Sequence, residues 1–137
     1  MSTPEVIENK ISYIEKHLSQ ARRYQSRSLE NLQDDAMLRG AVERELYVIA
    51  QAVIDLAEAV VAYKHLRKPT TMREALDILG EAEVLPKKFV SSFINIVGFR
   101  NALAHDYEDL RLEVVYDVLQ NKLKEVGEFL NHIKKIL

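Results

Sequence analysis

The chain has 137 residues and a formal net charge of −2, and 47% of its residues are hydrophobic while 29% are charged. This composition is typical of a globular protein and excludes an intrinsically disordered chain. The absence of cysteine excludes disulfides, thiolate zinc sites and cysteine nucleophiles, and the balanced charge means that any phosphate contact must be local.

The first predicted helix begins at Thr3-Pro4-Glu5, which supply an N-cap, a proline at the first helical position and an acidic residue in the first turn. Apolar residues then recur at steps of three and four and define one buried face, formed by Ile7, Ile11, Ile14, Leu18 and Ala21. The pattern then fades, and the polar stretch 25–35 predicts a loop with a short helical turn.

The second predicted helix begins near Asp34-Asp35 and ends before Pro69. From Leu46 to Tyr63, apolar residues occupy nearly every face of this helix. A helix that is apolar all round is buried all round. We therefore expect it to be the central helix of the fold and also to supply a subunit interface.

Three further helices complete the predicted fold. A short one spans 71–80, from a capping box to a glycine. A longer one opens at a proline and spans about 86–103, and the last runs over about 110–137. No segment alternates with a period of two, so the predicted class is all-α. We expect an up-and-down bundle of four long helices plus a short inserted helix, in a single domain over 1–137.

The sequence also predicts where the protein resides. The N-terminus lacks the basic-then-apolar layout of a signal peptide. No uncharged run approaches the ~20 apolar residues that a membrane-spanning helix needs. We therefore expect a soluble, cytoplasmic protein that has no membrane partner.

Residues 98–107 combine chemically active side chains at the point where a helical pattern ends. Arg100 offers a planar fork of donors that suits a phosphate, and His105 carries an imidazole, a group that can give or take a proton in catalysis. Such a pair is sufficient for metal-independent RNA cleavage, in which the 2′-hydroxyl attacks the neighbouring phosphate. Asn101 could position one of the reacting groups, and Tyr107 could add a donor.

A structural interpretation of the same residues stays open. His105 could cap the end of a helix while Arg100 pairs with an acidic neighbour such as Asp106 or Glu108. The spacing alone does not decide between the two interpretations, because short motifs also arise by chance.

The segment Arg100-Asn101-Ala102-Leu103-Ala104-His105-Asp106-Tyr107 resembles the R-x-x-x-x-H-x-Y motif of HepT toxins, which belong to the HEPN superfamily of small all-α ribonucleases. The polar residue directly after the arginine also matches. Residues 41–55 resemble the family's long second helix. The chain length, the helix order and the place of the motif before the last helix agree as well, so the resemblance covers essentially the whole chain.

The resemblance implies an endoribonuclease toxin of a two-gene, type VII-like toxin–antitoxin system that acts on RNA without a metal or another cofactor. It implies a homodimer with a composite cleft, in which Arg100 and His105 are catalytic and Asn101 supports them. It also implies a partner, an MntA-like nucleotidyltransferase antitoxin that transfers AMP from ATP to Tyr107. The added negative charge and bulk beside the phosphate site would inhibit cleavage.

Two other functions remain open. A non-catalytic HEPN module would use the same motif to bind nucleotide or RNA and would act with a partner nucleotidyltransferase. A histidine phosphotransfer bundle would need an exposed histidine within a helix, for which the candidates are His17, His105 and His132. We expect His17 and His132 to be solvated on charged helix faces, and Lys87-Lys88 to be a solvated helix start.

Overall fold

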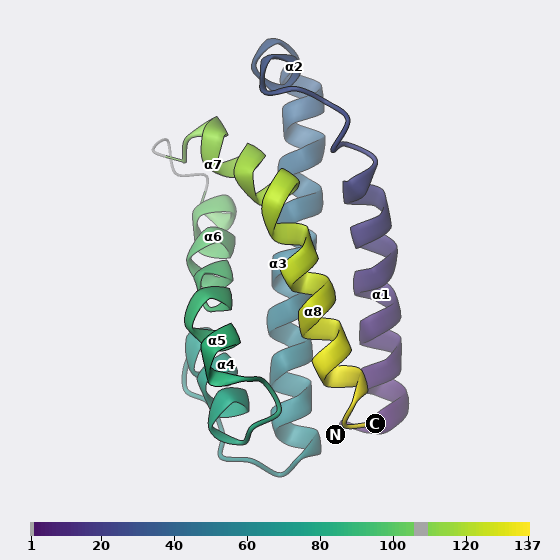
Figure 1. Cartoon of the computed structure of the whole chain (residues 1–137), viewed down its shortest axis with the longest axis vertical. Helices are drawn as coiled ribbons and strands as arrows, with labels where there is room; N and C mark the ends of the chain where they lie inside the picture. The colour runs from purple at the N-terminus through teal and green to yellow at the C-terminus, as the bar shows by residue number, and fades with distance from the viewer. Residues whose placement is uncertain (1, 106–109) are drawn as a thin grey trace.

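The computed structural model describes residues 2–105 and 110–137, and these residues form helices without any strand (Figure 1). The predicted all-α class is therefore confirmed for this part of the chain. The helices are α1 (Pro4–Arg22), α2 (Leu29–Asp34), α3 (Ala36–Tyr63), α4 (Met72–Glu81), α5 (Lys87–Phe93), α6 (Asn95–Ala104), α7 (Leu112–Asp117), a π-helical turn η1 (Val118–Lys122) and α8 (Leu123–Lys134).

Three helices begin where the sequence predicts, because a side chain at each start accepts a backbone hydrogen bond. Thr3 accepts from the Val6 amide at 3.2 Å, at the start of α1. Asp35 accepts from the amide three residues later at 3.0 Å, which starts α3. Thr71 does the same at 3.0 Å for α4. These bonds span three residues, so the local sequence alone specifies them.

The helix α3 occupies the middle of the bundle and packs against α1, α4 and α6, while α8 crosses in front of it in Figure 1. By length and composition α3 is apolar enough to cross a membrane, yet 56% of its most apolar window is buried inside the bundle. Its apolar character is thus mainly that of a core helix. The eleven buried residues on it are Val42, Leu46, Ile49, Ala50, Val53, Ile54, Leu56, Ala57, Ala59, Val60 and Val61.

The helix predicted over 86–103 is broken at Ile94 into α5 and α6. The hydroxyl of Ser91 donates to the carbonyl oxygen of Lys88 at 2.7 Å, and that of Ser92 donates to Phe89 at 3.3 Å. Such bonds compete with the backbone ladder and bend helices. These two bonds accompany the break at Ile94.

The helix predicted over 110–137 is also interrupted, by the π-helical turn η1. A π-turn loosens the regular backbone ladder. Here Gln25, from the segment between α1 and α2, donates to the carbonyl oxygen of Leu119 at 2.9 Å. In return, Gln120 donates to the carbonyl oxygen of Gln25 at 2.9 Å. The turn is thus held by a reciprocal contact with the N-terminal part of the chain.

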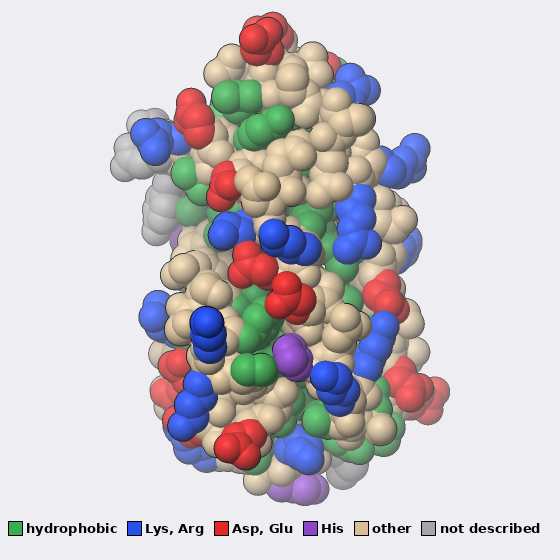
Figure 2. Space-filling model, viewed as in Figure 1, with side chains coloured by type: hydrophobic (Ala, Val, Ile, Leu, Met, Phe, Trp, Pro, Cys, Tyr) green, Lys and Arg blue, Asp and Glu red, His purple; other side chains and the backbone are tan. Residues whose placement is uncertain are grey.

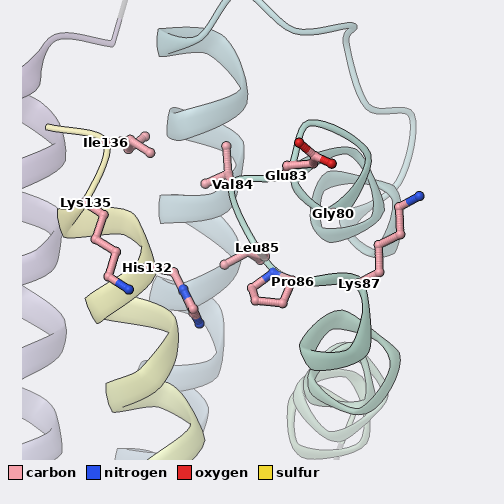
Figure 3. A pocket seen from close by; sticks show the side chains of 9 residues that line it. All are labelled: Gly80, Glu83, Val84, Leu85, Pro86, Lys87, His132, Lys135 and Ile136. Atoms are coloured by element: carbon pink, nitrogen blue, oxygen red, sulfur yellow. The ribbon is translucent and has the colours of Figure 1, made fainter.

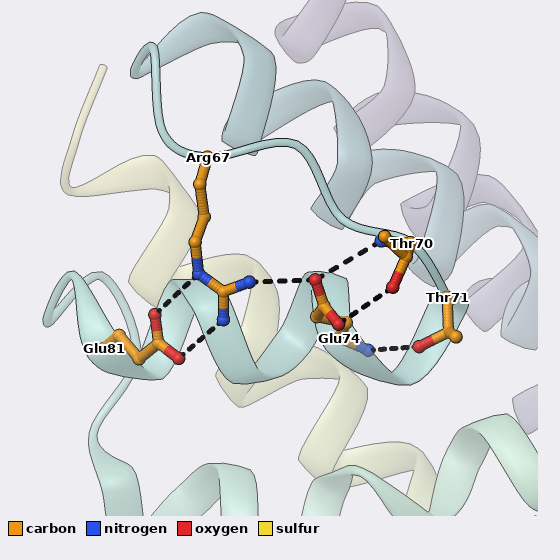
Figure 4. A network of polar contacts seen from close by, with 5 residues as sticks. All are labelled: Arg67, Thr70, Thr71, Glu74 and Glu81. Carbon is orange, nitrogen blue, oxygen red and sulfur yellow. Dashed lines mark hydrogen bonds and ion pairs between the residues drawn. The ribbon is translucent and has the colours of Figure 1, made fainter.

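Arg67 fastens the segment between α3 and α4 to α4 (Figure 4). Its guanidinium donates to Glu74 at 2.8 Å and to both oxygens of Glu81, at 2.8 and 3.2 Å. The hydroxyl of Thr70 donates to Glu74 at 3.0 Å. Hydrogen bonding from Thr70, followed by the charge of Arg67, lowers the pKa of Glu74, and hydrogen bonding from Arg67 lowers the pKa of Glu81.

Candidate active site

Arg100 lies half-buried on α6, where it faces α3. Its Nε donates to the side-chain oxygen of Gln51 at 2.6 Å, and its Nη1 donates to the side-chain oxygen of Asn101 at 3.0 Å. An arginine has five N–H donors. Within residues 2–105 and 110–137, no acceptor takes the other three. The guanidinium is therefore held at one side while donors remain for a phosphate.

Gln51 is itself oriented by a neighbour one turn along α3. Its amide nitrogen donates to a carboxylate oxygen of Asp55 at 2.9 Å, which turns the amide oxygen toward Arg100. Another turn along, burial together with the charge of Asp55 raises the pKa of Glu58. Gln51 and the carboxyl groups of Asp55 and Glu58 thus follow one another along the same side of α3.

The ring of Tyr47 lies under the same guanidinium. The Cζ atom of Arg100 is 5.6 Å from the ring centroid, and the Cζ atom of Arg44 is 5.9 Å from it. Both distances are within the range of a cation–π contact. Two positive charges therefore share one aromatic ring beside α6.

His105 follows directly on α6 and is its C-terminal cap. Its backbone N–H donates to the backbone oxygen of Asn101 at 3.1 Å, and its side chain is exposed. Asn101 thus accepts one bond from the side chain of Arg100 and one from the backbone of His105. The structure therefore brings these three predicted residues to the C-terminal end of one helix.

Tyr107 lies outside the described residues, as do Asp106 and Glu108, the acidic partners that the structural interpretation offers for Arg100. In the part of the chain that the structure describes, the hydrogen-bond partners of Arg100 are the uncharged amides of Gln51 and Asn101. A guanidinium held by amides keeps its full charge for an anionic ligand.

The prediction that His17 and His132 are solvated is wrong. His17 is half-buried between α1 and α3, contacts the carboxylate of Glu45, and has its ring centroid 4.5 Å from that of Tyr13. His132 packs its ring 5.5 Å from that of Phe89. Both contacts form between helices, where periodicity along one helix gives no information. Neither histidine has the exposed setting that a phosphotransfer bundle requires.

A hollow of about 480 Å³ between the α4–α5 connection and the end of α8 offers no convergent set of charges (Figure 3). The side chain of Lys87 points away from His132 and Lys135, and that of Glu83 points outward too. Lys87 and Lys88 are both exposed, as the sequence predicts. This hollow therefore lacks the features of an anion site.

Sequence reasoning missed Gln51 as a partner of Arg100 and did not assign Tyr47 to the site. A signal for Gln51 was present, because it is a polar residue within the otherwise apolar stretch 46–54. No signal in the sequence pairs it with Arg100, which lies 49 residues further along the chain.

The fold and this site define a small helical-bundle protein with an arginine, an asparagine and a histidine at the end of α6. The family model for HepT-like ribonucleases matches residues 14–133, so the chain belongs to the HepT-like family. This finding confirms the resemblance seen in the motif.

Curated relatives and a solved structure extend the comparison. The chain is 25% identical over 130 residues to the "mRNA nuclease HepT" of Shewanella oneidensis, covering 95% of this chain and 97% of the relative. It is 25% identical over 134 residues to the "tRNA nuclease HepT" of Aphanizomenon flos-aquae, covering 98% and 91%. The structure of a tri-AMPylated HEPN toxin of Shewanella oneidensis in complex with an MNT antitoxin superposes with a TM-score of 0.88 at 25% identity, covering 97% of this chain and 99% of that one.

Proposed function

We propose that this protein is a metal-independent endoribonuclease that acts as the toxin of a toxin–antitoxin system. The family and the two nuclease relatives support the reaction class. The observation that carries the proposal is the guanidinium of Arg100, which Gln51 and Asn101 hold on the helix that His105 caps, with three donors that no acceptor takes among residues 2–105 and 110–137. A fixed cation and a titratable imidazole at one helix end are the groups that phosphodiester cleavage requires.

The proposed reaction uses the RNA's own 2′-hydroxyl as the nucleophile. The bond from the 2′-oxygen to phosphorus forms while the bond to the 5′-oxygen of the next nucleotide breaks, which leaves a 2′,3′-cyclic phosphate and a 5′-hydroxyl. Arg100 stabilises the negative charge on the phosphate oxygens. His105 takes the proton from the 2′-hydroxyl or gives one to the departing 5′-oxygen. In a homodimer with a shared cleft, the two copies of His105 would divide these roles.

The proposed regulation acts on Tyr107. One relative of known structure is a tri-AMPylated toxin bound to an MNT antitoxin. We propose that an MntA-like nucleotidyltransferase transfers AMP from ATP to the hydroxyl of Tyr107, releasing pyrophosphate. A phosphodiester two residues beyond His105 would add negative charge and bulk where the RNA phosphate must bind. A cytoplasmic location suits both the RNA substrate and this partner.

Cleavage of single-stranded RNA in the presence of EDTA tests the proposed reaction. Arg100→Ala and His105→Ala should each lower the cleavage rate by about 100-fold or more, because each removes a group that acts on the reacting atoms. His65→Asn is the matched control, since His65 is exposed at the end of α3 with a φ of 55°, which asparagine also tolerates. His65→Asn should cleave RNA at the same rate as the protein without a substitution.

Equal, slow degradation by the unmodified protein and His105→Ala would contradict the proposal. Growth arrest on expression that survives His105→Ala would instead support the non-catalytic module, which binds RNA or nucleotide without cleaving it.

A further inference from the structure

A second hollow, of about 340 Å³, lies between α3 and the end of α6, and one of its lining residues is Tyr47, whose ring contacts Arg100. Its size is within the range of about 300–1,000 Å³ that is usual for small-molecule sites. From α3 it is lined by Glu43, Arg44 and Tyr47, and from α6 by Leu103 and Ala104. Ala104 immediately precedes His105, so the hollow adjoins the candidate active site.

The charge of this hollow is positive on balance. The carboxylate of Glu43 accepts a hydrogen bond from Nε of Arg39 at 2.8 Å, so its charge is compensated. Arg44 is exposed and forms no ion pair with any acidic group in residues 2–105 and 110–137. Its contact is with the ring of Tyr47. Arg44 is therefore a cation that remains available to a ligand phosphate.

The aromatic ring links this hollow to the site of cleavage. Arg44 and Arg100 both lie within 6 Å of the Tyr47 centroid, at 5.9 and 5.6 Å. Sites for single-stranded nucleic acid combine cations that follow the backbone with aromatic and apolar surface for the bases. Here Leu103 and the half-buried Tyr47 provide the apolar surface between two arginines.

We propose that this hollow binds the nucleotide next to the scissile phosphate, with its phosphate on Arg44 and its base or sugar against Tyr47 and Leu103. The inference rests on the proposed ribonuclease function and adds a substrate-binding subsite to it. Arg44 is a binding residue in this scheme, because it contacts the strand away from the bond that breaks. A chain of net charge −2 has no general attraction for RNA, so it must bind RNA through local phosphate contacts such as this one.

Binding can be measured apart from cleavage in the His105→Ala protein, by fluorescence anisotropy with a short fluorescein-labelled single-stranded RNA of mixed sequence. Arg44→Ala should raise the Kd about tenfold and reduce the slope of log K against log salt by about 0.7, the loss of one phosphate contact on a single strand. Arg44→Lys should retain most of the binding. Arg73→Ala, at an exposed arginine of α4 without an ion pair among the described residues, should leave both quantities unchanged.

Kinetics separate a subsite from a catalytic role. With His105 intact, Arg44→Ala should raise KM about tenfold and leave kcat unchanged, because a subsite contact contributes equally to the ground state and the transition state. Equal unfolding midpoints would show that the Arg44 and Arg73 variants remain folded. Tyr47→Phe should bind RNA as the unmodified protein does, whereas Tyr47→Leu should bind it more weakly.

An unchanged Kd for Arg44→Ala would overturn the subsite, because Arg44 would then make no contact with the RNA. An equal loss of affinity for Arg73→Ala would also overturn it, because the effect of Arg44 would then be due to net charge alone. Cleavage that does not depend on Arg44 would overturn the subsite and leave the ribonuclease intact. RNA binding that depends on Arg44 without any cleavage would refute the proposed reaction and leave the subsite intact.

Discussion

Gln51 reaches Arg100 through one short hydrogen bond, and Asp55 fixes the orientation of the Gln51 amide. Neither residue belongs to the motif over 98–107. Transition-state stabilisation depends on donors that are already in place, and a misplacement of about 1 Å can cost up to 100-fold in rate. We therefore regard Gln51 as a positioning residue that acts through Arg100.

Gln51→Leu should lower kcat about tenfold with little change in KM, since the guanidinium keeps its charge but loses its fixed position. Single-turnover cleavage of RNA would measure the change. The control is Gln33→Leu, because Gln33 is exposed on α2, a helix that contributes no residue to the site. In an Arg100→Ala background, Gln51→Leu should cause no further loss of rate. The same loss in both backgrounds would assign Gln51 a purely structural role.

At the scale of elements, local signals and contacts between helices explain different parts of the fold. The caps of α1, α3 and α4 are local, and their predicted starts are confirmed. The breaks that divide α5 from α6 and α7 from α8 were not predicted. The η1 turn is held by Gln25, which lies 94 residues from its partner Leu119, so no pattern in residues 110–137 reveals it.

The connection between α3 and α4 predicts a dependence of stability on pH. The pKa of Glu81 and that of Glu74 are below their ordinary value of 4.5 in the folded protein. A group with a lowered folded pKa stabilises the fold at pH values above its unfolded pKa, and this contribution is lost as the pH falls through the folded pKa. Arg67→Met should therefore lower the free energy of unfolding slightly at neutral pH and have almost no effect at about pH 3.

Urea denaturation of the unmodified protein and of Arg67→Met at both pH values would measure this difference. The effect at neutral pH should be modest, because Arg67 and Glu81 are exposed to solvent, Glu74 is partly exposed, and their charges are screened. Arg73→Met is the matched control on the same helix, and it should show no such dependence. A loss of stability of the same size at both pH values would exclude the ion pairs as its cause.

For the whole molecule, charge and assembly decide whether RNA can bind. Figure 2 shows that basic and acidic side chains are interspersed on the face viewed, with hydrophobic side chains between them. This face offers no broad basic surface. Because the chain has a net charge of −2, we expect RNA binding to depend on a local group of arginines. A homodimer would double that group in one cleft. The dimer that we expect from the apolar character of α3 remains a prediction.

Modification of Tyr107 is the prediction that belongs to the assembled system. Incubation with ATP and an MntA-like nucleotidyltransferase should increase the intact mass of the protein by whole AMP units and abolish RNA cleavage, because the added phosphate repels the RNA phosphate. Tyr107→Phe should gain no mass and remain active in the same mixture. Mass spectrometry and the cleavage assay measure the two effects, and a modified protein that still cleaves RNA would contradict the proposed regulation.

The sequence by itself determined the helical class, three helix starts, the central place of α3 and the motif that led to the HepT-like family. These features depend on caps that span three residues, on the period of apolar residues and on adjacent side chains. Only the tertiary structure decided that Gln51 and Tyr47 meet Arg100, that His17 meets Glu45 and that Arg44 lines a hollow beside the motif. These contacts join residues on different helices. They depend on how each helix is rotated and shifted against its neighbours, which the packing of the whole core sets.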